Sequence, residues 1–172
     1  MKIAVIGYSG SGKSTLAKKL GEKYGCDVLH IDSVHFLPGW VEREKEDEQK
    51  IVSGFLDSRE SWVTDGTYTK LSYERRMEEA DMIVMMLFNR FSCLHRVVKR
   101  YKKYKNSARP DAAEGCNEKL DPEFITWVLW RGRKKKTRQR YKDLQKRYKE
   151  KAAVIKNQKQ LVEFEKREGL PL

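Results

Sequence analysis

The sequence predicts an α/β fold, in which helices cover both faces of a parallel sheet in three layers, α/β/α. Two observations lead to this prediction. Short runs of β-branched and apolar residues alternate along the chain with longer segments of helical periodicity. One of the runs, residues 82–88 (MIVMMLF), is apolar throughout, which is typical of a central strand covered on both faces.

Five short segments have the composition of strands. Residues 2–6 are mostly β-branched or apolar, are too few for a helix, and are followed directly by glycines. The second segment ends at Asp32, and the third is stopped by Asp65 and Gly66. The predicted strands are residues 2–6, 28–31, 61–64, 82–88 and 152–155.

Helical periodicity fills the intervals between these strands. Leu16, Ala17 and Leu20 share one face of the first helix, as inward-facing side chains do. After the fourth strand, the apolar residues that recur at helical spacing are Phe91, Leu94, Val98 and Tyr101. The other predicted helices are residues 14–24, 42–58, 73–79, 122–130, 136–150 and 158–167.

Two stretches are expected to be irregular. A loop carries His35 and the Pro38, Gly39 and Trp40 triplet, and residues 106–122 contain proline, glycine and asparagine, as a loop or lid would. The chain has neither an internal repeat nor a linker that would divide it, so one domain spanning residues 1–172 is expected.

Composition excludes several classes of protein. No apolar run approaches the roughly 18 residues that a membrane-spanning helix needs. The N-terminus lacks the apolar stretch and cleavage site of a secretory signal, so no membrane partner and a cytoplasmic location are expected. Cys26, Cys93 and Cys116 are far apart and form no CxxC pair, which favours reduced thiols over disulfides or a zinc site.

The net charge of +12 comes from one part of the chain. Residues 90–151 contain 21 Lys and Arg against 7 Asp and Glu, whereas the remainder has 16 against 18. The basic residues are densest in 96–109 and 131–151. Such runs could follow a nucleic-acid backbone, line a pocket for the phosphates of a small nucleotide, or form a solvated helix face.

Residues 7–14 (GYSGSGKS) match the pattern G-x-x-x-x-G-K-[ST] at every fixed position. Glycines let such a loop fold so that consecutive backbone N–H groups point at phosphate oxygens, and the following helix adds its positive N-terminal end. The motif therefore predicts binding of a purine nucleotide. ATP is favoured, because the chain lacks the NKxD signature of GTP-specific switch proteins.

Within this loop the residues have different expected roles. Lys13 would reach the β- and γ-phosphates, and the hydroxyl of Ser14 would hold Mg²⁺. The expected nucleotide-binding residues are Gly7, Ser9, Gly10, Ser11, Gly12, Lys13, Ser14 and Thr15.

Two aspartates follow predicted strands, at the edge where an open α/β sheet places its ligands. Asp65 is the better candidate for the carboxylate that orients water on Mg²⁺. Asp32 could accept a proton from a substrate hydroxyl, contact the metal or contact a substrate ring. The structural alternative for both is a turn-forming aspartate that caps the next segment.

Phosphoryl transfer also needs positive charge that closes over the transferring group. Arg96, Arg100 and Lys103 share one face of the predicted helix, opposite its apolar residues, and Arg109 lies on the loop just beyond. The expected catalytic residues are Lys13, Asp32, Asp65, Arg96, Arg100 and Arg109.

Aromatic residues offer candidates for the substrate pocket and for the core. His35 and Trp40 could line the pocket, because an aromatic ring beside a phosphate loop can stack on a base, although core packing is an equal alternative for Trp40. Trp62, Trp127 and Trp130 are expected to pack in the core or between helices.

Several further segments, taken with the phosphate loop, carry a family resemblance. They are His30-Ile31-Asp32, Pro38-Gly39-Trp40, WVTDGTY at 62–68, Ala80-Asp81, Arg109-Pro110-Asp111 and Glu114-Gly115-Cys116. On these residues the chain resembles the adenylate kinase-like branch of P-loop kinases over nearly its full length. More narrowly, it resembles the bacterial family labelled "DNA topology modulation protein", which is regarded as a family of nucleotide kinases.

The resemblance implies a P-loop NTPase fold like that of nucleoside monophosphate kinases, with a five-stranded parallel sheet and a helical lid. It implies a substrate-binding helical segment at 40–58 and a lid at 105–122. In such kinases, arginines of the helix before the lid and of the lid itself neutralise the transferring phosphate, which is the role implied for Arg96, Arg100 and Arg109. Gly66 and Tyr68 of the WVTDGTY segment, with Asp32, His35 and Trp40, are the expected substrate-binding residues.

The chain also departs from the sequence pattern of these kinases at several positions. Where many relatives end the fourth strand with an aspartate followed by Pro-Arg, this chain has Asn89 and Arg90. The lid lacks paired CxxC motifs, so a zinc-stabilised lid is not expected. Only Arg43 and Arg59 are available for an arginine-rich AMP site.

These observations predict a Mg-ATP-dependent phosphotransferase that acts on a nucleotide, of the nucleoside monophosphate type, or on another small acceptor. The expected cofactors are ATP and Mg²⁺. The alternative is a nucleic-acid-associated P-loop ATPase or regulator, in which the 12 basic residues of 131–151 bind DNA or RNA phosphates weakly.

Overall fold

The computed structural model describes residues 1–105 and 115–172, and its main sheet has five strands in the order β2, β5, β1, β6, β7. Every neighbouring pair in this sheet is parallel, which confirms the predicted α/β class. The strands are β1 (Lys2–Gly7), β2 (Asp27–His30), β5 (Trp62–Asp65), β6 (Met82–Met86) and β7 (Ala152–Ile155).

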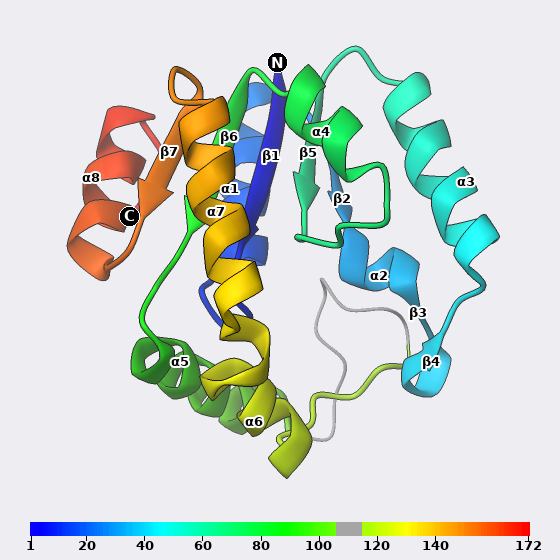
Figure 1. Ribbon diagram of the computed structural model, residues 1–172, viewed down its shortest axis with the longest axis vertical. Helices are drawn as coiled ribbons and strands as arrows, with labels where there is room; N and C mark the ends of the chain where they lie inside the picture. The colour runs from blue at the N-terminus through cyan, green and yellow to red at the C-terminus, as the bar shows by residue number, and fades with distance from the viewer. Residues whose placement is uncertain (106–114) are drawn as a thin grey trace.

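Helices cover both faces of this sheet (Figure 1). One face is covered by α1 (Lys13–Tyr24) and α8 (Gln158–Arg167). The helices on the other face are α2 (Ile31–His35), α3 (Lys45–Asp57), α4 (Tyr73–Glu79) and α7 (Lys135–Arg147). The three layers expected from the sequence are therefore present.

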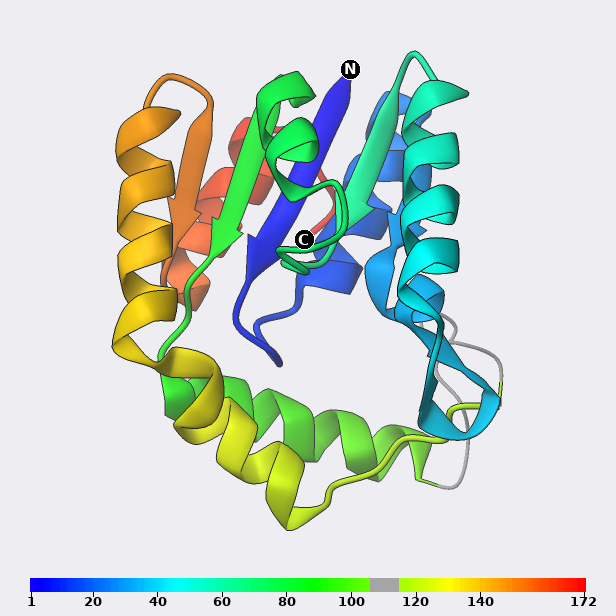
Figure 2. The same cartoon turned by 45° about the vertical axis from the view of Figure 1, so that its right-hand side comes forward.

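Two further helices lie beyond the carboxyl ends of the strands (Figure 2). They are α5 (Arg90–Tyr104) and α6 (Pro122–Leu129), and the short 3-10 helix η2 (Arg131–Arg133) connects them to α7. They face the end of the sheet from which the phosphate loop emerges, so the candidate site lies between them and the strands.

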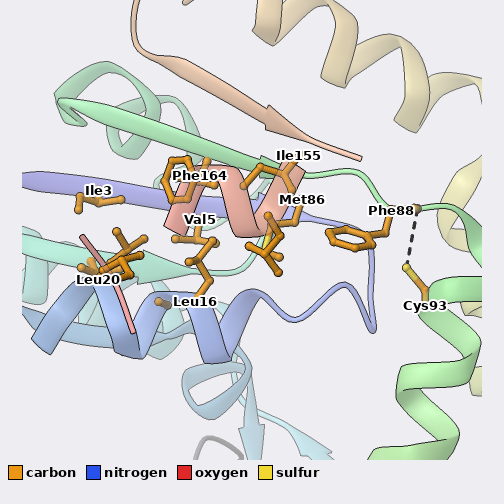
Figure 3. Close-up of a cluster of buried hydrophobic side chains, with 14 of the residues drawn as sticks. Ile3, Val5, Leu16, Leu20, Met86, Phe88, Cys93, Ile155 and Phe164 are labelled. Carbon is orange, nitrogen blue, oxygen red and sulfur yellow. Dashed lines mark hydrogen bonds between the residues drawn. The ribbon is translucent and has the colours of Figure 1, made fainter. Parts of the chain in front are cut away.

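Alternate side chains of the central strands pack into two separate cores, as the pleat of a strand requires. Val5 belongs to the cluster shared with α1 and α8, whereas its neighbour Ile6 belongs to the cluster shared with α3, α4 and α7. Figure 3 shows the first cluster, which continues from Leu16 on α1 to Phe88 and Cys93. The phosphate loop is thus supported by the core on its α1 side.

A small hairpin replaces part of the predicted loop and the start of the predicted 42–58 helix. It consists of β3 (Phe36–Leu37), η1 (Pro38–Trp40) and β4 (Val41–Glu42), with an antiparallel pairing. Gly39 and Trp40 both have positive φ, 78° and 67°, and this reverses the chain. His35, also predicted to be in a loop, ends the helix α2.

The inward face of α5 differs from the prediction. Phe91 is 72% exposed, and the buried residues of this helix are Cys93 and Val97. A Cβ added at Gly10 would lie 2.6 Å from Val97 Cγ2, so this face packs closely against the phosphate loop. The other three predicted residues are partly buried, so the inward face is rotated toward the small side chains that pack on the glycine loop and is not reversed.

The tryptophans divide into a core residue and two surface residues. Trp62 is fully buried in β5, as predicted. Trp127 and Trp130, expected in the core or between helices, are not core residues, because they are 46% and 57% exposed on and after α6. None of the helices in the described ranges has the length and apolar composition of a membrane-spanning segment.

Candidate functional site

The phosphate loop joins β1 to α1, as the sequence predicts, and its backbone requires glycine. Gly7 and Gly10 have φ of 143° and 77°. A Cβ at Gly7 would lie 2.2 Å from the carbonyl oxygen of Met86, and one at Gly10 would lie 2.7 Å from that of Cys93. Both contacts are far inside van der Waals distance, so no other residue fits without moving the neighbouring backbone.

Lys13 lies where the loop becomes a helix. Its ammonium group donates a hydrogen bond of 3.1 Å to the carbonyl oxygen of Tyr8, which folds the side chain back along the loop. The helix starts at Lys13 without a side-chain cap, so Ser14 and Thr15 stand in a first turn whose N–H groups are available to an anion. This combination suits a bound phosphate.

The two serines of the loop have different surroundings. Ser9 Oγ accepts a hydrogen bond of 3.2 Å from the indole N–H of Trp127. Ser11 is fully buried, its hydroxyl has no partner among the described residues, and its carbonyl oxygen accepts from Arg96. The loop is therefore held from both α5 and α6.

Asp65 ends β5 beside β1, where the sequence predicted it. It is 5% exposed, and its Oδ2 lies 2.9 Å from Nδ1 of His30, the residue opposite it on β2. Its Oδ1 is buried and has no hydrogen-bond partner in the described part of the chain. A buried carboxylate oxygen without a partner is costly, which indicates that a ligand or an ordered water satisfies it.

Asp32 does not follow β2 directly as predicted, because the strand ends at His30 and Asp32 is the second residue of α2. The hydroxyl of Tyr68 donates a hydrogen bond of 2.8 Å to Asp32 Oδ1. Burial raises the pKa of Tyr68, and the negative charge of Asp32 raises it further. Tyr68 is therefore a protonated donor throughout the neutral range.

His35 joins the same group of residues. Its Nδ1 lies 2.6 Å from Oε1 of the buried Glu48, and its ring is 4.9 Å from that of Tyr68. Gly66 approaches the helix α2 closely, since a Cβ there would lie 2.9 Å from that of Ile31. The structure thus brings together four of the five residues expected to bind substrate.

Trp40, the fifth, makes its contacts elsewhere. Its ring is 5.2 Å from that of Phe36, and its indole N–H donates a hydrogen bond of 3.0 Å to the carbonyl oxygen of Asn117. It links the hairpin to residues 115–119 of the expected lid.

The basic residues expected to neutralise phosphate are already engaged. Arg96 donates to the carbonyl oxygen of Ser11 at 2.5 Å and to Gln158 Oε1 at 2.6 Å, and its guanidinium lies 4.1 Å from the ring centre of Phe88. Arg100 forms an ion pair of 2.6 Å with Glu118. Arg109 lies outside the described residues.

A cavity of about 380 Å³ opens beside Arg96. Its lining residues are Phe88, Phe91, Ser92, His95, Arg96 and Gln158. Aromatic rings and a guanidinium at its wall offer flat surfaces on which a planar ring can stack.

Arg133 is a residue of the site that the sequence patterns do not single out. Its guanidinium lies 3.8 Å from the ring centre of Tyr8 and donates to Phe88 O at 2.9 Å and to Cys93 Sγ at 3.0 Å. It belongs to the 131–151 charge run, and nothing in the local sequence distinguishes it from its neighbours. Its contact with the phosphate loop comes from the fold.

Two other basic residues of this run contact α4 or the residue that follows it. Arg147 pairs with Glu74 and Glu78 of α4, and Lys151 donates to the carbonyl oxygens of Glu78 and Ala80. Part of the basic segment is therefore used to attach α7 and the start of β7 to α4.

Comparison with known proteins gives two relatives with partial coverage, while no protein-family model matches the chain. The chain is 28% identical over 130 residues to a gluconokinase of Arabidopsis thaliana, which covers 76% of this chain and 59% of that protein. It is 35% identical over 82 residues to a shikimate kinase of Persephonella marina, covering 48% and 44%. The chain thus spans about half the length of these relatives.

Solved structures extend the likeness to nearly the whole chain. A gluconokinase from Sinorhizobium meliloti 1021 matches with a TM-score of 0.55 at 18% identity, covering 98% of this chain and 89% of that one. A deoxyadenosine kinase from M. mycoides with bound dATP also matches with a TM-score of 0.55, at 16% identity, covering 97% and 98%. The fold is therefore that of P-loop kinases.

Proposed function

We propose that the protein is a Mg-ATP-dependent phosphotransferase that acts on a small molecule. The observation that carries this proposal is the phosphate loop, whose glycines cannot be replaced and whose lysine is folded along the loop beside the start of α1. The gluconokinases, the shikimate kinase and the deoxyadenosine kinase that the chain matches are all kinases, which supports phosphoryl transfer over simple nucleotide binding.

ATP is expected to bind with its phosphates on residues 7–15. Lys13 and the first turn of α1 would hold the phosphate oxygens, while the base would enter the cavity beside Arg96. This assignment gives Arg96 a role in shaping the base pocket and the loop, since both of its terminal nitrogens are already bonded. Arg133, stacked on Tyr8, is a further source of positive charge near the loop.

Ser14 and Asp65 are the residues proposed to hold Mg²⁺. The unpartnered Oδ1 of Asp65 fits this role, either as a ligand or through a water. No group of three or more His, Cys, Asp and Glu side chains gathers in the described ranges, which suits an ion that is held largely by water and substrate phosphates. When bound, Mg²⁺ would neutralise charge on the β- and γ-phosphates.

The acceptor is proposed to bind near Asp32, His35, Gly66 and Tyr68. Because Tyr68 occupies only Oδ1 of Asp32, the second oxygen can accept a proton from an acceptor hydroxyl as it attacks the γ-phosphate. Glu48 holds Nδ1 of His35 and so directs Nε2 toward the exposed Glu42, 3.8 Å away, where the imidazole is proposed as a second recognition group. A nucleoside monophosphate, which would accept on a phosphate oxygen, or another small phosphorylated or hydroxylated molecule remains the proposed acceptor class. Arg109 and Arg100, which is paired with Glu118, are proposed to add charge from the lid side.

The DNA alternative has less support. Arg133 and Lys151 of the basic segment donate to backbone carbonyls and Arg147 forms surface ion pairs with α4, which leaves fewer unpaired charges for a nucleic-acid backbone. The relatives that the chain matches are a gluconokinase and a shikimate kinase, which does not support membership of the DNA topology modulation family.

A panel assay tests the proposed activity. The protein is incubated with Mg-ATP and, separately, nucleoside monophosphates, nucleosides, sugar acids and polyols, and new phosphorylated species are measured by mass spectrometry. Lys13→Ala is expected to abolish the product, because its ammonium group would no longer reach the phosphates. Lys23→Ala, an exposed lysine at the other end of α1, is the matched control and should retain activity.

If no acceptor reacts above the Lys13→Ala background, the kinase proposal fails. If, in addition, DNA stimulates ATP hydrolysis, the regulator alternative replaces it.

A further inference from the structure

Arg76 on α4 is a charged side chain with no exposed surface. Its guanidinium donates to main-chain carbonyl oxygens of the segment between β5 and α4. Nε donates to Leu71 at 3.0 Å, one terminal nitrogen donates to Gly66 at 2.9 Å, and the other donates to Tyr68 at 3.1 Å. In residues 1–105 and 115–172, the structure shows no ion pair between Arg76 and a carboxylate.

This pattern is informative because a buried charge without a counter-ion is unfavourable unless hydrogen bonds surround it. Burial lowers the pKa of Arg76 to about 10, so the side chain remains charged at neutral pH. A guanidinium has five N–H groups in a planar fork, which matches carbonyls that converge from one loop. A lysine ammonium group could not reach all of them in the same plane.

The segment that Arg76 holds, residues 66–71, touches both halves of the candidate site. Thr67 Oγ1 lies 3.2 Å from both the N and the O of Gly7, the first residue of the phosphate loop, and 3.1 Å from the hydroxyl of Tyr141. The next residue, Tyr68, donates to Asp32. One buried arginine therefore sets the backbone that fixes both the donor side and the acceptor side.

We propose that Arg76 is a positioning residue, which holds the 66–71 segment so that Thr67 supports the phosphate loop and Tyr68 orients Asp32. This proposal deepens the proposed phosphotransferase function. Only its kinetic test depends on that function. Arg76 itself touches neither substrate nor cofactor in this scheme.

The main test compares Arg76→Lys with Arg75→Lys. Arg75 is the adjacent residue on α4 and pairs with Glu79 and Asp57 on the surface. Hydrogen exchange of the amides of residues 66–71 should become faster in Arg76→Lys only. With an acceptor identified, kcat/KM at a temperature well below unfolding should fall by about 10- to 100-fold in Arg76→Lys and stay within about twofold in Arg75→Lys.

A second pair of variants guards against misfolding of Arg76→Lys. Thr67→Val removes the hydroxyl that contacts Gly7, and Thr67→Ser keeps it. Thr67→Val should weaken ATP binding in a direct titration by about tenfold, and Thr67→Ser should restore most of the affinity. A purely structural role would lower the unfolding temperature of both without separating their affinities.

The outcomes distinguish this proposal from the proposed function. Unchanged exchange of residues 66–71 in folded Arg76→Lys, or equal ATP affinity of Thr67→Val and Thr67→Ser, overturns the positioning role whether or not a substrate is known. Absence of any phosphorylated product with the wild-type protein overturns the kinase assignment, while the exchange and ATP titrations still decide the role of Arg76.

Discussion

Glycines show how differently the same residue is used at two places in this chain. Gly10 has a φ of 77° and faces the carbonyl of Cys93 so closely that a methyl group would collide with it. Gly54 lies within α3, is exposed, and has no atom within 4 Å of an added Cβ. The first is required by the phosphate loop, whereas the second only lowers the helix propensity of α3.

A matched pair of substitutions tests this contrast. Gly10→Ala should destabilise the fold by about 2 kcal/mol or more, from left-handed strain and overlap with the backbone of α5, and should remove stabilisation by Mg-ATP. Gly54→Ala should raise the free energy of unfolding by about 0.5 to 1 kcal/mol and leave nucleotide binding intact. Urea unfolding with and without Mg-ATP measures both, and a Gly10→Ala protein that still gains stability from nucleotide would contradict the loop geometry.

Asp32 provides the second prediction at this scale. If it accepts the proton of the acceptor hydroxyl, Asp32→Asn should lower kcat by roughly 10²- to 10⁴-fold and leave the KM for Mg-ATP nearly unchanged. Asp27→Asn, at an exposed aspartate that pairs with Arg59, is the control and should behave as wild type. Steady-state kinetics with the identified acceptor measure both variants, and an unchanged kcat for Asp32→Asn would exclude Asp32 as the general base.

The residues that sequence could locate are those whose role depends on local spacing. The phosphate loop and Asp65 are set by a short motif and by a strand end, and both stand where they were expected. Thr67 lies within the WVTDGTY segment, but its contact with Gly7 and the contacts of Arg76 with the 66–71 segment are not indicated by local spacing. These contacts are apparent only in the three-dimensional structure.

At the scale of elements, the hairpin and the described part of the expected lid are joined. Trp40 donates to the carbonyl oxygen of Asn117, and the thiol of Cys116 donates to that of Leu37 at 3.3 Å. Cys116 is only 1% exposed as a result. Trp40 adopts a positive φ of 67°, a strained conformation for a bulky residue that such contacts must stabilise.

The thiol of Cys116 can report on this junction. Trp40→Ala should speed the reaction of Cys116 with a maleimide at least about tenfold. The indole hydrogen bond and ring contacts stabilise the junction that buries this thiol, and their loss should destabilise the junction by about 1.4 kcal/mol or more. Trp130→Ala, at a more exposed tryptophan, is the control and should not change the rate. Peptide mass spectrometry separates Cys116 from the other thiols, and equal rates in the two variants would show that Trp40 does not hold the junction.

Element boundaries illustrate where sequence patterns fail. The last strand and helix begin and end where periodicity places them, at Ala152–Ile155 and Gln158–Arg167. The helix α2 and the hairpin after it were missed, because each is held by contacts to other elements rather than by its own propensity. For α5, apolarity favoured the Phe91 face, although proximity to glycines required the small Cys93 face.

For the whole molecule, the location of the positive charge bears on both functional hypotheses. Residues 90–151 carry an excess of +14, whereas the remainder of the sequence is nearly neutral. Arg96 and Arg133 contact the phosphate loop or its supports, and Arg147 attaches α7 to α4. These residues are thus engaged by the phosphate loop or by neighbouring helices, whereas most of the basic residues of 131–151 remain exposed.

The last prediction uses the stability of the entire chain. A ligand that binds only the folded state at 100 times its Kd adds about 2.7 kcal/mol, which for a protein of this size raises the unfolding temperature by roughly 5 to 10 °C. Mg-ATP should produce this shift, and Lys13→Ala should lose it. Duplex DNA should give a smaller shift that disappears as salt rises from about 50 to 200 mM, because exposed lysines bind phosphates with a steep salt dependence. A large shift from duplex DNA at about 50 mM salt that falls steeply as salt rises, with no shift from Mg-ATP, would reverse the assignment, since the basic segment would then be the principal binding site.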